Sequence, residues 1–221
     1  MKDMVVTIDG PAGAGKTTVS RQLAGRLGYR YVDTGALYRG VAHAAREKGI
    51  EPTDDDALAM LCAGLKLELV ASENGSRLIS GGLDITDRIR TPEITMLASA
   101  VSARPVVRQF LLGLQRRLGA ERRAVFEGRD MGTVVFPEAD VKFFLSADVA
   151  ERARRRFNEL PHENGLTLEQ VAADIRRRDE NDSTRNIAPL KPAEDAIMVD
   201  STDKTPEEVI DFMLGYIRDK F

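Results

Sequence analysis

Residues 10–17 of the chain are Gly10-Pro11-Ala12-Gly13-Ala14-Gly15-Lys16-Thr17. This stretch satisfies the Walker A spacing G-x-x-x-x-G-K-[ST] and directly follows residues 4–8, an apolar run typical of a strand. Its three glycines allow several backbone N–H groups to converge on phosphate oxygens at a helix N-terminus. We therefore expect residues 10–18 to bind a nucleoside triphosphate, with ATP as the phosphoryl donor.

The side chains at the end of this loop supply further phosphate chemistry. Lys16 is expected to reach the β- and γ-phosphates, and Thr17 to offer its hydroxyl to Mg²⁺ as a metal ligand. Thr18 adds a donor on the α-phosphate side. A Gly-rich turn without a ligand is the alternative, and the complete pattern between a strand and a helix argues against it.

The composition is typical of one globular unit that acts on small molecules. The 221 residues carry a net charge of −3, whereas proteins that coat nucleic acid usually have a basic excess, so we expect no nucleic-acid partner. No apolar run approaches membrane-spanning length, and Cys62 is the single cysteine. We therefore expect no membrane partner and a reducing, cytoplasmic location. We also expect a monomer, because no long apolar patch demands a partner.

Alternating strand and helix patterns predict an α/β fold in which helices cover both faces of a parallel sheet. The candidate strands are Val5–Ile8, Tyr29–Val32, Ala124–Phe126, Val141–Leu145 and Ala196–Val199. The candidate helices are Lys16–Leu27, Ala36–Lys48, Asp54–Leu65, Val106–Arg122, Ala147–Leu160, Leu168–Asp182 and Pro206–Lys220. Between about Leu65 and Thr91, short alternating segments joined by Asn74-Gly75 and Gly81-Gly82 predict hairpins. We interpret this stretch as a small antiparallel β insert.

Two further clusters follow predicted strands, at the edge where a parallel sheet binds ligands. Thr34 is expected to cap the second helix, near whose positive end Arg39 would favour an anion. A capping Thr with a solvated Arg is the alternative. After the third strand, Arg129 can fork onto phosphate and Asp130 can accept from an amino group; a purely structural Arg129–Asp130 pair is the alternative.

Two arginine-rich segments lie on later helices. The chain contains 24 Arg and only 8 Lys. The first segment carries Arg152, Arg154, Arg155 and Arg156, and the second carries Arg176, Arg177, Arg178 and Arg185. Such runs are usually solvated faces. A phosphoryl transfer between two anions needs cations that arrive as the site closes, so we interpret about 152–166 as an Arg-rich lid, with Pro161–Gly165 as its loop.

Motifs of other nucleotide-dependent classes are missing from the sequence. There is no N-K-x-D and no D-x-x-G, so the sequence lacks the motifs with which a GTPase binds guanine and forms its switch regions. No strong candidate nucleophile is present, and His43 and His162 alone cannot build a metal cluster. Catalysis would then depend on positioning and charge stabilisation.

Together these segments resemble the bacterial cytidylate kinases, a family of nucleoside monophosphate kinases. The resemblance covers nearly the whole chain and rests on I-D-G-P-A-G-A-G-K-T-T, D-T-G-A-L-Y-R, I-R-T-P-E-I, residues 99–108, G-R-D-M-G-T-V-V-F-P, E-R-A-R-R-R and R-x-x-x-D-x-x-R-x-x-A-P-L. It implies a P-loop kinase fold with a five-stranded parallel sheet, and phosphorylation of CMP or dCMP by Mg-ATP. It also implies one unit, with a core of about 1–62 and 104–221 and a monophosphate-binding insert of about 63–103.

The resemblance further implies roles for individual residues. Ser99, Arg108 and Asp130 would contact the cytosine edge, and Arg178 and Asp182 would lie near the ribose. The monophosphate would be held by Thr34, which stands where the family often has Ser, and by Arg39, Arg129 and Arg185. Lys16 and these three arginines would be catalytic because they neutralise charge. Arg152 and Arg156 of the lid would contact ATP, and Thr17 departs from relatives that carry Gly there.

Two alternatives to this function stay open on sequence grounds. The chain could be a kinase of another small acceptor, such as UMP or a metabolite that is not a nucleotide. It could also be a nucleotide-binding regulator that has lost turnover, although every charged position that the chemistry needs is present. Uracil offers a carbonyl where cytosine has its amine, so an Asp130 acceptor would disfavour UMP.

Overall fold

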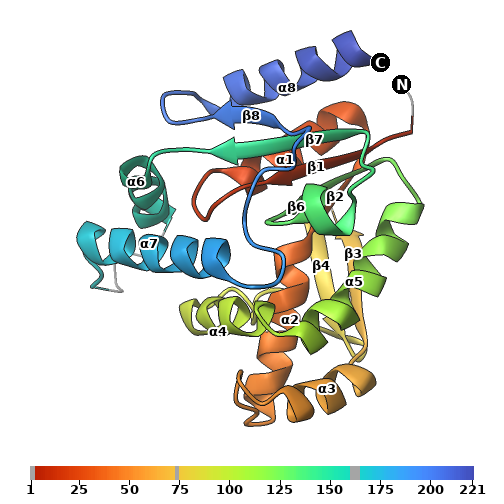
Figure 1. Ribbon diagram of the computed structural model, residues 1–221, viewed down its shortest axis with the longest axis vertical. Helices are drawn as coiled ribbons and strands as arrows, with labels where there is room; N and C mark the ends of the chain where they lie inside the picture. The colour runs from red at the N-terminus through yellow and green to blue at the C-terminus, as the bar shows by residue number, and fades with distance from the viewer. Residues whose placement is uncertain (1–2, 73–74, 160–164) are drawn as a thin grey trace.

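The computed structural model describes residues 3–72, 75–159 and 165–221. Its centre is a five-stranded parallel sheet in the order β2-β6-β1-β7-β8 (Figure 1). The strands are β1 (Val5–Asp9), β2 (Arg30–Asp33), β6 (Ala124–Gly128), β7 (Val141–Ser146) and β8 (Ile197–Asp200). The expected parallel sheet is confirmed, and β1 lies between β6 and β7.

Both faces of this sheet are buried. Val6 and Ile8 of β1 point to one face, which α1 (Lys16–Leu27) and α8 (Pro206–Lys220) cover. Val5 of β1 and Phe126 of β6 point to the other face, against Met131 and Val135. Successive residues of a strand point to opposite faces, and burial on both faces explains why these strands are continuous apolar runs.

The second layer combines helices and a small antiparallel sheet. The helices are α2 (Thr34–Glu47), α3 (Asp55–Gly64), α4 (Pro92–Ser102) and α5 (Pro105–Ala120). The expected β insert is confirmed as β3 (Leu67–Ser72), β4 (Gly75–Ser80) and β5 (Leu83–Asp84), in the order β3-β4-β5. Gly81 and Gly82 have φ of 55° and 86°, as the predicted turn requires. Asn74 of the other predicted turn lies outside the described residues.

Helix α4 was not among the predicted elements. It begins at a conventional N-terminal signal: the Thr91 side chain accepts from the Ile94 N–H, Pro92 occupies the first turn, and Glu93 follows. This helix matters for function because it carries Thr95, Ala98 and Ser99 to the site described below.

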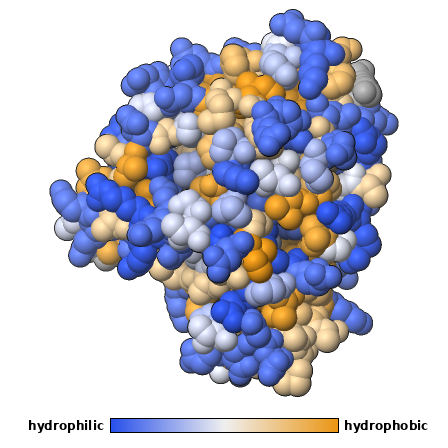
Figure 2. All heavy atoms as spheres, viewed as in Figure 1, coloured by the Kyte–Doolittle hydropathy of each residue, from blue (hydrophilic) through white to orange (hydrophobic). Residues whose placement is uncertain are grey.

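Helices α6 (Val149–Glu159) and α7 (Leu168–Thr184) pack side by side around their own small core of Ala153, Val171 and Ile175. They project at the left of the view, where hydrophilic residues predominate on the surface (Figures 1 and 2). The predicted lid loop lies outside the described residues except for Gly165. In the described ranges, no helix is long and apolar enough to cross a bilayer.

Candidate functional site

A cavity of about 670 Å³ opens where β1, β2 and β6 end. The segments that follow these strands line it, together with residues from α4, α6 and α7. Among the predicted site residues, those that line it are Ala12, Gly13, Ala14, Gly15, Lys16, Thr17, Thr18, Thr34, Arg39, Ser99, Arg108, Arg129, Asp130, Arg156, Arg178, Asp182 and Arg185. Gly10, Pro11 and Arg152 do not line it. The fold therefore brings the predicted donor-side and acceptor-side residues to one cavity.

The phosphate loop is shaped by backbone crowding. A Cβ atom on Gly10 would lie 1.9 Å from the carbonyl oxygen of Leu145, so a side chain is excluded there. Gly15 has a φ of 84° and precedes α1, which has no side-chain cap. The first N–H groups of α1 thus have no capping side chain, an arrangement suited to an anion.

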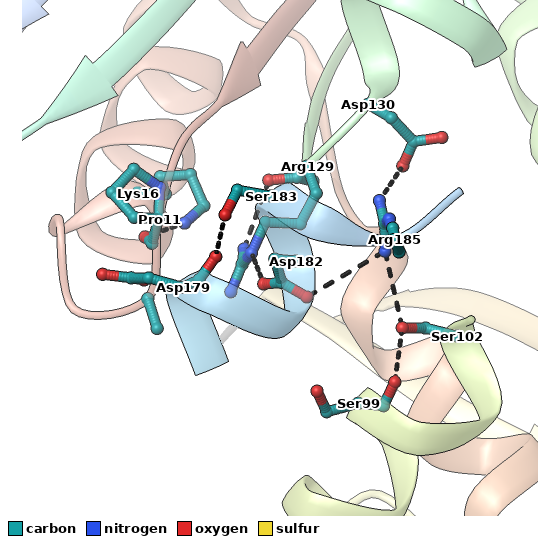
Figure 3. Close-up of polar contacts among 12 residues, drawn as sticks. Pro11, Lys16, Ser99, Ser102, Arg129, Asp130, Asp179, Asp182, Ser183 and Arg185 are labelled. Carbon is teal, nitrogen blue, oxygen red and sulfur yellow. Dashed lines mark hydrogen bonds and ion pairs between the residues drawn. The ribbon is translucent and has the colours of Figure 1, made fainter. Parts of the chain in front are cut away.

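Lys16 lies buried beneath this loop. It is 4% exposed, and its Nζ donates to the Pro11 carbonyl oxygen at 2.7 Å (Figure 3). Burial, reinforced by Arg129, lowers the pKa of Lys16 to about 7, while Glu127, Asp182 and Asp9 oppose this shift. Burial therefore disfavours the charged form of Lys16, and an anion bound beside the amine would restore that form.

We predict that binding of the nucleoside triphosphate expected at residues 10–18 takes up, at pH 8, as much as about one proton at Lys16, because nearby phosphates favour the charged amine. At this pH a group with a pKa near 7 is mostly neutral before the nucleotide binds. Calorimetric titrations in buffers of different ionisation enthalpy measure the uptake. Lys16→Met should abolish it, and equal uptake by both proteins would contradict the assignment to Lys16.

Glu127 is a site residue that the sequence interpretation left without a role. Its Oε1 accepts from the Thr17 hydroxyl at 2.8 Å, and its Oε2 accepts from the Tyr31 hydroxyl at 2.6 Å. Burial and the neighbouring Asp33 raise the pKa of Glu127, while Lys16 opposes the shift. The available signal was an acidic residue at the end of a strand, but its neighbour Thr17 is 110 positions away in the chain.

The expected capping role of Thr34 is wrong. Asp33 is the N-cap of α2, with its Oδ1 accepting from the Ala36 N–H at 3.0 Å. The Thr34 hydroxyl instead donates to the Glu127 carbonyl oxygen at 2.6 Å. A capping residue precedes the helix, whereas Thr34 is already its first residue, so the helix begins earlier than expected.

Asp9, at the end of β1, connects the loop that begins at Gly10 with the segment that follows β6. Its carboxylate accepts from the backbone N–H groups of Met131 at 2.9 Å and Gly132 at 2.7 Å. Burial raises the pKa of Asp9 to about 6, although these two hydrogen bonds oppose the shift. The residue that precedes Gly10 thus fixes the segment that follows Asp130.

Several guanidinium groups converge in the middle of the cavity. Arg129 donates from Nε to Asp182 Oδ2 at 2.9 Å, so the alternative Arg129–Asp130 pair does not form (Figure 3). Buried Nε atoms of Arg39 and Arg178 have no hydrogen-bond partner within the described ranges. Burial, then Arg129, lowers the pKa of Arg178 to about 10, which leaves it charged at neutral pH. Cations with unused donors are the groups that a bound anion would need.

Asp130 lies at the far end of the cavity and is 2% exposed. It forms an ion pair with Arg108, and Arg185 Nη2 lies 3.5 Å from its Oδ1 (Figure 3). Burial raises the pKa of Asp130, although both arginines oppose this. Ser102 is a site residue that the sequence interpretation missed. Its carbonyl oxygen accepts from Arg108 Nη1 at 3.2 Å, and its hydroxyl donates to the Ser99 carbonyl oxygen at 2.8 Å.

The arginines of α6 differ in where they point. Arg152 is buried and donates from Nη1 to the Ala12 carbonyl oxygen at 3.0 Å and to Asp179 Oδ2 at 2.6 Å. Arg156 lines the cavity and pairs with Glu159 at 3.2 Å. Arg155, which had no individual assignment, also lines the cavity and donates from Nη2 to the Ser201 carbonyl oxygen at 2.6 Å.

Comparisons with known proteins agree with one another. The family model described as "Cytidylate kinase" matches residues 6–219. A protein named cytidylate kinase from Geobacter sulfurreducens is 51% identical over 99% of this chain and 94% of its own length. One from Halalkalibacterium halodurans is 43% identical over 100% of both chains.

Solved structures are similar in fold at low identity. A shikimate kinase from Bacteroides thetaiotaomicron matches with a TM-score of 0.51 at 11% identity, covering 97% of this chain and 98% of its own. A shikimate kinase from Acinetobacter baumannii, in complex with shikimate, matches with a TM-score of 0.50 at 15% identity, covering 98% and 93%. These structures share the α/β architecture of the sheet and its flanking helices.

Proposed function

The chain belongs to the cytidylate kinase family, and from this premise we propose that it transfers the γ-phosphoryl group of Mg-ATP directly and in line to the phosphate of CMP or dCMP. The products are ADP and CDP or dCDP. The observation that supports this proposal is one cavity with the phosphate loop, a group of arginines and the buried Asp130 along it. The loop suits the triphosphate of the donor, the arginines suit the phosphate of the acceptor, and Asp130 suits the base of the acceptor.

The donor side is formed by residues 10–18, with Lys16 neutralising the transferring group and Arg156 reaching the nucleotide from α6. Backbone N–H groups and a buried cation stabilise phosphoryl charge without a covalent intermediate. We further propose a core of about 1–62 and 104–221, a monophosphate-binding insert of about 63–103 and a lid of about 152–166. Closure of the lid would exclude water and so limit wasteful hydrolysis of ATP.

Mg²⁺ fits the donor side because the available ligands are oxygens. Thr17 and Glu127 both line the cavity and lie within hydrogen-bond distance of each other, and hard cations prefer hydroxyl and carboxylate oxygens. Held there, the ion would supply positive charge that offsets the charge of the donor phosphates. Thr17 would hold it, with Glu127 supporting the threonine hydroxyl.

The acceptor phosphate would be held by Arg39, Arg129 and Arg185, with Thr34 beside them. Its second pKa is near 6, so it is largely ionised at neutral pH and needs no general base. Arg178 and Asp182 would contact the ribose. On binding, the phosphate would compete with Asp182 for Arg129, which donates to that carboxylate at 2.9 Å.

The cytosine edge would be contacted by Ser99, Arg108 and Asp130. A carboxylate that accepts from the exocyclic amine favours cytosine over uracil, because the uracil carbonyl would leave two acceptors facing each other. Burial raises the pKa of Asp130, whereas Arg108 and Arg185 favour its ionised form, in which both oxygens accept.

Asp130→Asn is expected to reduce the preference for CMP over UMP, measured as the ratio of kcat/KM values, by roughly 10- to 100-fold. This corresponds to the about 1–3 kcal/mol that a mismatched buried polar group costs. KM for ATP should stay within about twofold. The exposed Asp174→Asn, on α7, is the control for loss of a charge. Undiminished discrimination against UMP would exclude Asp130 as the base-contacting residue.

The proposed reaction is tested with [γ-³²P]ATP and unlabelled CMP. Direct transfer predicts that the label appears in CDP and that none is retained on denatured protein. Label on the protein at a catalytically competent rate would contradict direct transfer. Release of labelled phosphate without labelled CDP would contradict the kinase function itself.

A further inference from the structure

Both oxygens of the Glu127 carboxylate are occupied by hydroxyl donors from two different elements. Thr17, at the start of α1, donates to Oε1 at 2.8 Å, and Tyr31, on β2, donates to Oε2 at 2.6 Å. Thr17 and Glu127 line the cavity. Tyr31 is not among its lining residues, so Tyr31 would act on a ligand in the cavity through a neighbour, and Glu127 is the cavity residue to which its hydroxyl donates.

The strand register explains why Tyr31 reaches Glu127. Residue 33 of β2 is level with residue 127 of β6, so Tyr31 and Glu127 are diagonal neighbours on one face of the sheet. The Tyr31 ring packs against the core between the sheet and helices α1 and α8. This packing holds the ring in one orientation, and the ring in turn holds the hydroxyl oxygen beside Glu127.

The hydrogen bonds also set the direction of the Thr17 hydroxyl. A threonine hydroxyl has one proton and two lone pairs, and an ionised carboxylate can only accept. Burial raises the pKa of Tyr31 further above its usual range, so it remains a donor. The Thr17 hydroxyl donates to Glu127 Oε1, so its proton points to Glu127 and its lone pairs remain available to the cavity.

We infer that Tyr31 is a positioning residue for the divalent cation that accompanies the phosphoryl donor. It holds Glu127 in place, Glu127 holds the proton of the Thr17 hydroxyl, and the Thr17 oxygen is left to ligate the cation. This inference rests on the proposed function, since it takes Mg²⁺ to enter with the nucleotide.

The test measures binding of ADP by calorimetry in excess Mg²⁺ and in EDTA, and needs no turnover. Mg²⁺ should tighten ADP binding to the wild-type protein. Tyr31→Phe should reduce this tightening by about tenfold, the lower end of the effect of losing an outer-shell partner, and leave binding in EDTA unchanged. Tyr216→Phe, on α8, is the matched control. Equal tightening in Tyr31→Phe and wild type would overturn the inference.

A double-mutant cycle separates positioning from general loss of structure. In a Thr17→Ala background the hydroxyl is already gone, so adding Tyr31→Phe should cause no further loss of Mg²⁺-dependent tightening. A further tenfold loss in that background would overturn the inference, because Tyr31 would then act by another route.

Glu127→Gln provides a second variant that retains the Tyr31 ring and so guards against misfolding of Tyr31→Phe. An amide that donates to the Thr17 oxygen would occupy one of its lone pairs, so the Mg²⁺-dependent tightening should fall at least as much as in Tyr31→Phe. Unchanged tightening would count against the inference. ADP binding does not involve the acceptor, so failure to phosphorylate CMP would refute the proposed function without touching this result.

Discussion

Lys16→Ala is expected to lower kcat with Mg-ATP and CMP by about 10³-fold, the magnitude for loss of a preorganised charge at a transferring phosphoryl group. Lys16 is buried beneath the loop, at 4% exposure, and its amine donates to the Pro11 carbonyl oxygen of the same loop. Initial rates of ADP formation measure the change. KM for CMP should move little, because we propose that Lys16 acts on the donor.

Lys48→Ala is the matched control, since this exposed lysine follows α2. The folded state should tolerate Lys16→Ala well. Its buried amine has a pKa lowered to about 7, so between about pH 7 and 10.5 the unfolded state binds the extra proton and stability rises with pH there. Below pH 7 the variant should therefore unfold at no lower temperature than wild type. A kcat within tenfold of wild type would contradict the role of Lys16.

Arg129→Ala is expected to lower kcat with CMP by about 10³-fold while ATP still binds within a few-fold of wild type. Arg129 follows β6 and lies among the acceptor-side arginines, where its Nε donates to Asp182. Its loss would remove a guanidinium from the point where we propose that charge passes between donor and acceptor. Arg129→Lys restores the charge without the planar fork and should recover only part of the activity.

Nucleotide binding and steady-state kinetics on the same protein preparations check this prediction. Arg177→Ala, an exposed position on α7, controls for removal of an arginine. Unchanged turnover of Arg129→Ala with CMP would exclude it from catalysis. Equal loss of ATP binding and turnover would instead assign Arg129 to the donor side.

The sheet and the insert were predictable because their signals are local. A strand, a Gly-rich loop and a helix follow one another in residues 4–27, and the hairpin turn at Gly81-Gly82 contains its own glycines. Helix α4 was missed although Thr91 and Pro92 mark its start. The alternating β pattern was predicted to end near Thr91, and no element was assigned to the residues of α4 that follow.

Most of the predicted site residues line the cavity, but few of their contacts were predicted. Glu127 meets Thr17 because β6 lies next to β1, and this strand order is not visible in the chain order. Arg129 pairs with Asp182 of α7, a helix that is distant in the sequence and whose position beside the end of β6 depends on the tertiary fold. Arg152 shares an arginine run with Arg156, yet packing of α6 against the phosphate loop turns Arg152 towards Ala12. Composition cannot distinguish the two.

The most direct measurement compares ADP formation from Mg-ATP with CMP, dCMP, UMP, AMP and no acceptor, side by side, for the wild-type protein and Lys16→Ala. We expect rapid, Lys16-dependent turnover with CMP and dCMP and much slower turnover with the other acceptors. Absence of turnover with every nucleoside monophosphate, or equal rates with all of them, would contradict a kinase whose acceptor is selected by Ser99, Arg108 and Asp130.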